Sequence, residues 1–199
     1  MFRNTILNIF EDIWPMILIF SVIIISLRIV YLYNNKKRFV LYKEILSLGF
    51  ILYVICLFRV VTFQDVSWST SNFIPFKEML RYDFGSKLFF RNVIGNMIMF
   101  IPYGFFISYI LKIKKPTIAV ILTFIVSFTI ETTQILIGRV FDIDDIFLNI
   151  LGGLVGYIVF YLTGRLKFKG LLQKEIFYNI IIVLILILII LYLTGVIYV

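Results

Sequence analysis

Amide and acid side chains recur at three- and four-residue spacing in three short stretches of the chain. In order, they are Asn92 with Asn96, Glu131 with Gln134, and Asp142 with Asp145 and Asn149. Residues three or four apart lie on one face of a helix, so each stretch predicts a polar helical face. Such groups hydrogen-bond peptides and sugars, transfer protons, or hold Mg²⁺ through oxygen.

The elements that carry these residues are apolar helices. Apolar residues make up 62% of the chain and charged residues 15%, whereas soluble domains have about 45–50% and about 25%. Runs of about 20 apolar residues span the hydrocarbon of a bilayer as helices. The sequence therefore predicts an all-α integral membrane protein, one membrane domain over residues 1–199 with a core motif region at 72–157. Its six predicted spans are 13–33, 45–63, 93–111, 117–137, 146–163 and 177–198.

Several classes of function are excluded by composition. The chain has no histidine, so it has no histidine-based catalytic triad and no histidine metal site. Its one cysteine, Cys56, lies in an apolar run and is interpreted as a small hydrophobic residue. The net charge of +8 comes from basic residues in short loops between spans, which indicates membrane topology rather than a nucleic-acid partner.

The distribution of basic residues predicts the orientation in the membrane. The side that holds the loops after the first, third and fifth spans carries 12 lysines and arginines, and the other side carries 7. Cytoplasmic loops are the more basic, so both termini are expected to lie outside the cell. Between the second and third spans, residues 64–88 repeat apolar side chains at helical spacing, which predicts a short amphipathic helix in the membrane interface.

Alternating topology places the start of the third span, the end of the fourth and the start of the fifth at one membrane face. The polar stretches are thereby expected to surround one outward-facing pocket. A carboxylate such as Glu131 inside a span indicates a functional site. The alternative is a purely structural role, in which Arg139 or Arg91 holds Glu131 and the polar residues only keep the helices together. The glycine pair Gly152 and Gly156 predicts close contact with a neighbouring span.

At these residues the sequence resembles the VanZ-like family. The resemblance rests on the order and spacing of Asn72-Phe73-Ile74-Pro75-Phe76, Asn92-Val93-Ile94-Gly95-Asn96, Phe100-Ile101-Pro102-Tyr103-Gly104-Phe105, Glu131-Thr132-Thr133-Gln134, and Arg139 to Asp145 followed by Asn149, Gly152, Gly153 and Gly156. It implies a small protein of the bacterial cytoplasmic membrane that is linked to low-level tolerance of glycopeptide antibiotics, the family's namesake acting chiefly against lipid-tailed teicoplanin. It identifies neither an established reaction nor a cofactor.

Three functions follow from these features. The first is a non-catalytic factor among membrane lipids that binds or excludes a lipoglycopeptide, or its lipid-linked cell-wall target, at the outer face. The second is an intramembrane enzyme that acts on a lipid-linked envelope precursor through paired carboxylates or bound Mg²⁺. The third is a small transporter, which the absence of internal repeats disfavours. The predicted pocket residues are Asn72, Arg91, Asn92, Asn96, Glu131, Gln134, Arg139, Asp142, Asp145 and Asn149.

Overall fold

The fold, a computed structural model, is all-helical in the residues it describes, which are 2–62, 71–165 and 171–193. The long helices are α1 (Phe2–Asn34), α2 (Leu41–Thr62), α4 (Gly95–Leu111), α5 (Pro116–Leu136), α6 (Ile143–Gly164) and α7 (Leu171–Leu193). Three short elements precede α4, namely the 3-10 helix η1 (Met79–Arg81), α3 (Lys87–Phe89) and the π-helical turn η2 (Phe90–Ile94).

Five helical segments in the described residues are long and apolar enough to cross a membrane. They are Ile13–Asn34, Leu41–Thr62, Lys87–Leu111, Pro116–Leu136 and Ile143–Gly164, and they match the first five predicted spans to within a few residues at most ends. The third span begins earlier than predicted, because α3 and η2 run directly into α4. The sixth predicted span overlaps α7, but its residues 194–198 lie outside the described part of the chain.

The chain divides into two compact units, residues 1–60 with 167–199 and residues 61–166. In the first unit, Arg28 of α1 forms an ion pair with Glu44 of α2, in which the Nε–Oε2 distance is 2.6 Å. The backbone N–H of Tyr42 in α2 donates to Oδ1 of Asn179 in α7 at 3.0 Å. Polar side chains in otherwise apolar helices thus tie the three helices of this unit together.

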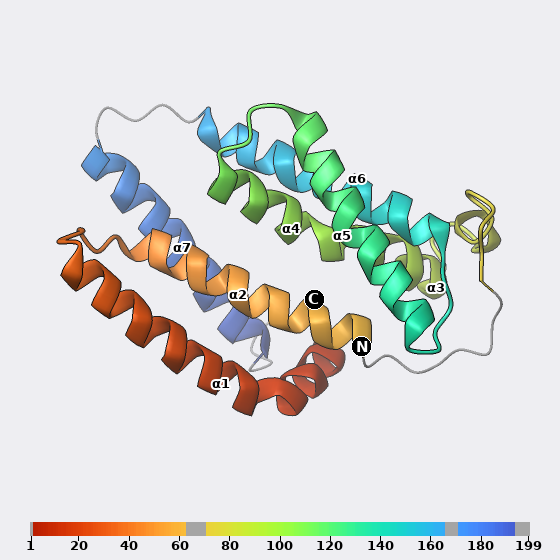
Figure 1. The fold of residues 1–199 in the computed structure, drawn as a ribbon, viewed down its shortest axis with the longest axis horizontal. Coiled ribbons are helices and arrows are strands. Elements are labelled where there is room, and N and C mark those ends of the chain that lie inside the picture. The colour runs from red at the N-terminus through yellow and green to blue at the C-terminus, as the bar shows by residue number, and fades with distance from the viewer. Residues whose placement is uncertain (1, 63–70, 166–170, 194–199) are drawn as a thin grey trace. The chain divides into compact units, whose positions relative to one another are not determined.

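The second unit contains α4, α5 and α6, with α4 beside α6 (Figure 1). Glycines make this approach close, since a Cβ on Gly156 would lie 2.1 Å from the carbonyl oxygen of Ile101. A Cβ on Gly104 would likewise lie 2.0 Å from the carbonyl oxygen of Gly153. The predicted close contact at Gly152 and Gly156 is therefore confirmed, and α4 is the neighbouring helix.

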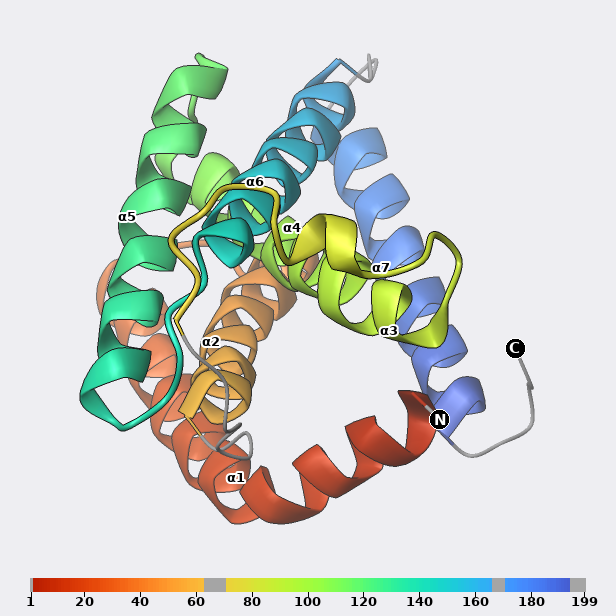
Figure 2. The ribbon, with the colours of Figure 1, turned by 90° about the vertical axis from the view of Figure 1, so that its right-hand side faces the viewer.

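Residues 71–86, which we call the strap, cross the start of α6 (Figure 2). The structure does not confirm an amphipathic helix in this segment, because the strap forms turns, η1 and an isolated β-bridge at Asn72. Residues 64–70 lie outside the described part of the chain. The backbone gives the physical reason. Phe76 has a left-handed φ of 66°, and the N–H groups of Phe76, Glu78 and Met79 donate to a side chain of α6 instead of to helical carbonyls.

Candidate functional site

The start of α4, the end of α5 and the start of α6 meet at one end of the second unit, as the predicted topology requires. Nδ2 of Asn96 in α4 donates to Oδ1 of Asp145 in α6. The backbone N–H of Asp142, just before α6, donates to Oε2 of Glu131 in α5 at 2.9 Å. The three polar stretches are therefore in contact.

Glu131 is held at the end of α5 with 2% of its surface exposed. With its amide oriented to satisfy both neighbours, Gln134 donates to Oε1 of Glu131 at 3.2 Å and accepts from Nη1 of Arg139 at 3.0 Å. The same Nη1 donates to the carbonyl of Val61. Arg139 is thus linked to Glu131 through Gln134. Gly138, at a φ of 80°, makes the turn that returns the chain from α5 toward α6.

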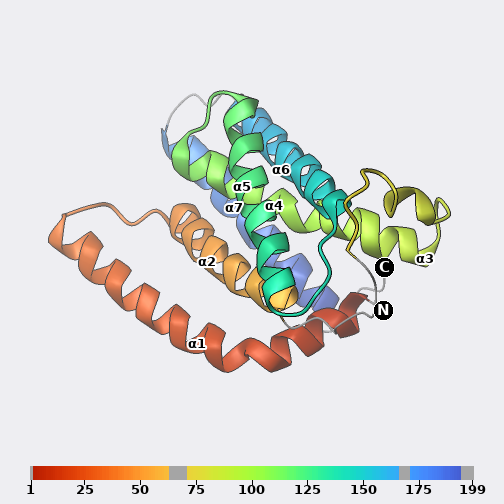
Figure 3. The same ribbon diagram turned by 45° about the vertical axis from the view of Figure 1, so that its right-hand side comes forward.

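Asp142 caps α6 and joins it to the strap. Its Oδ1 accepts from the backbone N–H of Asp144 at 2.9 Å and from Nδ2 of Asn72 at 2.9 Å. The backbones also pair, because Asn72 N–H donates to the carbonyl of Phe141 at 2.8 Å and Ile143 N–H donates to the carbonyl of Asn72 at 3.1 Å. The two segments run side by side in Figure 3. Burial raises the pKa of Asp142, against the opposing effect of these hydrogen bonds.

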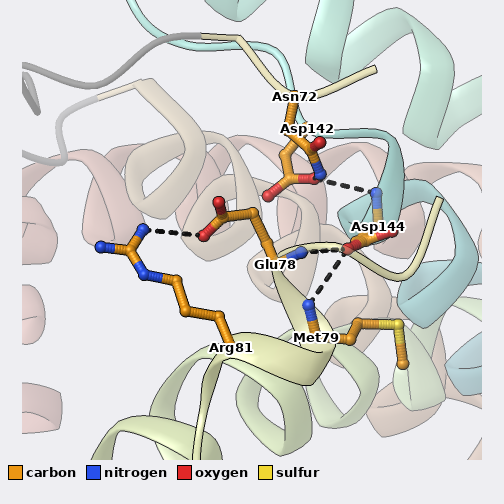
Figure 4. A network of polar contacts seen from close by, with 6 residues as sticks. All are labelled: Asn72, Glu78, Met79, Arg81, Asp142 and Asp144. Carbon is orange, nitrogen blue, oxygen red and sulfur yellow. Dashed lines mark hydrogen bonds and ion pairs between the residues drawn. The ribbon is translucent and has the colours of Figure 1, made fainter. Parts of the chain in front are cut away.

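Asp144 holds the strap in place and was missed by the sequence analysis. Its side chain is 1% exposed. Its Oδ1 accepts from Phe76 N–H at 2.5 Å, and its Oδ2 accepts from Glu78 N–H at 2.8 Å and Met79 N–H at 3.1 Å. Figure 4 shows the last two donors directed at the carboxylate. Each helical residue turns by about 100°, so Asp144 points away from the face of Asp145, toward the strap.

Stacked aromatic rings support the same attachment. Phe73 of the strap stacks on Phe141 with ring centroids 5.1 Å apart. Phe76 stacks on Phe147 of α6 at 5.5 Å. Polar bonds and ring contacts together therefore fix the strap across the helix start.

The hydrogen-bonded residues at this end of the unit form what we call the polar cluster, namely Asn72, Asn96, Glu131, Gln134, Arg139, Asp142, Asp144 and Asp145. Asn149 lies one turn deeper in α6, where its Nδ2 donates to Oγ of Ser127 in α5 at 2.9 Å. No group of three acidic or cysteine side chains among the described residues is arranged to hold a metal ion.

Two predicted site residues, Arg91 and Asn92, are outside the polar cluster. Among the described residues their side chains make no hydrogen bond, and Arg91 is exposed while Asn92 is partly exposed. The π-helical turn explains why Asn92 does not lie on the same helical face as Asn96. Gly95 N–H bonds to the carbonyl of Phe90, five residues back, so a spacing of four no longer returns to one face.

The five apolar helices, three of which meet at a buried polar end, define a multi-pass membrane protein. A model of the VanZ/LLP1 family matches residues 45–164, which is more than half of the chain. The chain therefore belongs to the VanZ/LLP1 family, and at family level this supports a membrane protein associated with glycopeptide resistance. Comparisons with curated proteins and with solved structures gave no significant match.

Proposed function

We propose that this protein lowers the susceptibility of a bacterium to lipoglycopeptide antibiotics such as teicoplanin. It does so by binding or excluding the drug, or a lipid-linked cell-wall target, at the outer face of the cytoplasmic membrane. The observation that carries the proposal is the arrangement at the start of α4. Arg91 and Asn92, which have no hydrogen-bond partner among the described residues, lie just before the rigid polar cluster.

The polar cluster supports this role by holding the helix ends in place while leaving polar groups for a ligand. The side chains of Glu131, Asp142 and Asp144 are engaged with groups of the chain itself. A guanidinium and a carboxamide beside them offer donors and an acceptor to a peptide or sugar head. The apolar helices would accommodate the fatty tail.

The proposal includes an arrangement in the membrane. Six spans, with α7 as part of the last, place both termini outside, as the excess of basic residues on the opposite side favours. The strap then lies at the outer interface. Its side chains suit that position, because Leu80 is 83% exposed and Phe84 is 93% exposed, while Lys77 and Arg81 remain in the polar layer.

Expression in a susceptible host tests the proposal. The minimal inhibitory concentration of teicoplanin is expected to rise with the wild-type protein, and that of tailless vancomycin to rise less. Arg91→Gln and Asn92→Leu are expected to remove the protection without lowering the amount of protein in the membrane. Arg165→Gln is the matched control, because Arg165 is exposed beyond the opposite end of α6. Equal protection against both drugs, or full protection by the Arg91→Gln protein, contradicts the proposal.

The second candidate function is an intramembrane enzyme that acts on a lipid-linked envelope precursor. The observation that favours it is the electrostatic interaction of two carboxylates on facing helices, Glu131 of α5 and Asp145 of α6. Paired carboxylates can divide the roles of general acid and general base. Mass spectrometry of precursor lipids tests the enzyme, because an unchanged lipid pool after deletion of the gene would contradict it.

A further inference from the structure

A polar layer between α5 and α6 lies deeper than the polar cluster and has no role in the proposed function. On α5, Ser127 is four residues before Glu131, and on α6, Asn149 is four residues after Asp145. The hydrogen bond from Asn149 to Ser127 shows that these two faces meet. Six residues beyond the start of α6, Asn149 lies about 9 Å along the helix axis.

Asn149 leaves one buried oxygen without a partner. The residue is 2% exposed, and its Oδ1 accepts no hydrogen bond from any described residue. Its amide group is fixed between α5 and α6 by the bond to Ser127. Buried polar atoms are normally paired, and an orphaned acceptor inside an apolar bundle indicates a missing positive or donor group.

Asp145, one turn nearer the surface on the same face of α6, lies close to three other acidic residues. In the described residues its carboxylate accepts one side-chain hydrogen bond, from Asn96. The charged groups that act on it most strongly are acidic, namely Glu131, Asp142 and Asp144. The carboxylate of Asp144 is compensated by three N–H groups, whereas Asp145 has no such donor set.

From this juxtaposition we propose that a sodium ion binds between α5 and α6, with Asp145, Asn149 Oδ1 and the Ser127 hydroxyl as its oxygen ligands. A hard cation prefers carboxylate, carbonyl and hydroxyl oxygens. The hydroxyl oxygen of Ser127 has two lone pairs. One can coordinate the ion while the other accepts the hydrogen bond from Asn149. One carboxylate with neutral oxygens matches a single positive charge. A divalent ion fits less well, since no three acidic side chains of the described residues are placed to hold one ion together. Asp145 is partly exposed, whereas Asn149 and Ser127 are buried.

Thermal unfolding of the purified full-length protein in detergent tests the sodium site. Sodium chloride is exchanged for potassium or N-methylglucamine chloride at constant ionic strength, and the comparison is repeated at several fixed pH values. A ligand that binds only the folded state stabilises it in proportion to the logarithm of its concentration above Kd. The unfolding midpoint is therefore expected to rise with sodium and to rise much less with the other two cations.

Variants assign the effect to the proposed ligands. Asp145→Asn and Asn149→Leu are expected to remove the sodium-dependent rise of the midpoint. Ser127→Ala is expected to weaken it, while Ser108→Ala is expected to leave it intact. Ser108 is the matched control, because it is an equally buried serine whose hydroxyl donates to the carbonyl of Gly104 in α4 at 2.6 Å.

Direct binding of radioactive sodium to the wild-type protein keeps the inference testable if a variant does not fold. Saturable binding of one ion per chain supports the site. Three outcomes overturn it: no saturable binding, equal midpoints in all three salts, or a midpoint that follows pH but not sodium. The last outcome would assign a proton to Asp145 instead. Because none of these readouts involves an antibiotic, the inference stands or fails separately from the proposed function.

Discussion

Replacement of Asp144 by asparagine tests whether the strap depends on one carboxylate. The side chain keeps its size, but one of the two oxygens becomes an NH₂ group. If the remaining oxygen faces Glu78 and Met79, whose N–H groups lie 2.8 and 3.1 Å from Oδ2, the NH₂ group faces the N–H of Phe76. The N–H of Phe76 then has no acceptor, whereas in the wild-type protein it donates to Oδ1 of Asp144 at 2.5 Å.

The expected loss follows from these bonds. A hydrogen bond to a charged group contributes about 1.5–3 kcal/mol, and the two remaining bonds weaken because the acceptor is neutral. Detachment of the strap from α6 should therefore become easier by about 2–4 kcal/mol. Each 1.4 kcal/mol is tenfold in an equilibrium, so the N–H groups of Phe76, Glu78 and Met79 should exchange with solvent roughly 30- to 700-fold faster.

Hydrogen–deuterium exchange measured by mass spectrometry on peptides from the strap is the assay. Asp83→Asn is the matched control, since Asp83 is an exposed acid of the same strap and its side chain makes no hydrogen bond to the described residues. The control should exchange like the wild-type protein. If Asp144→Asn leaves the exchange of residues 76–79 unchanged, the carboxylate does not hold the strap and the reasoning is wrong.

Two further predictions concern the helix contact and the cap of α6. Gly156→Ala should lower the stability by about 1–3 kcal/mol or more, because its Cβ would lie 2.1 Å from the backbone oxygen of Ile101. Gly164→Ala, with nothing within 4 Å, should change the unfolding midpoint in detergent little. Burial raises the pKa of Asp142 above its usual 3.8, so the folded state holds that proton more tightly than the unfolded state. The contribution of this proton to the free energy of unfolding is complete at pH values below the usual pKa of Asp142. It is lost as the pH rises through the raised pKa of the folded state. A pH series should show this fall in the wild-type protein and a flatter profile for Asp142→Asn.

Much of the fold follows from local properties of the sequence. Apolar runs of about 20 residues predicted the five helices that are long and apolar enough to cross a membrane. The short connections between them required the polar ends of α4, α5 and α6 to meet. The contacts of Asn96 with Asp145 and of Asp142 with Glu131 confirm that reasoning. Gly152 and Gly156 indicated the helix contact because only small residues permit such an approach.

The strap and Asp144 were not predictable in the same way. Their contact joins residues 65 to 68 positions apart, and the donors are backbone N–H groups, which every residue but proline carries. The apolar spacing in residues 76–88 favoured a helix, but the buried carboxylate bound those N–H groups instead. The position of Asn92 was mispredicted because nothing in its local sequence indicated a π-helical turn in place of an α-helical one.

The separation of the strap from Asp144 also bears on biogenesis. The ribosome makes Phe76 68 residues before the carboxylate that its N–H binds. At about 5–20 residues per second, this delay lasts roughly 3–14 s. During that interval α4 and α5 are synthesised, while the nascent strap lacks its acceptor. Mutations that slow insertion of α6 should therefore expose the strap to quality-control proteases at the translocon, even when every residue of the polar cluster is intact.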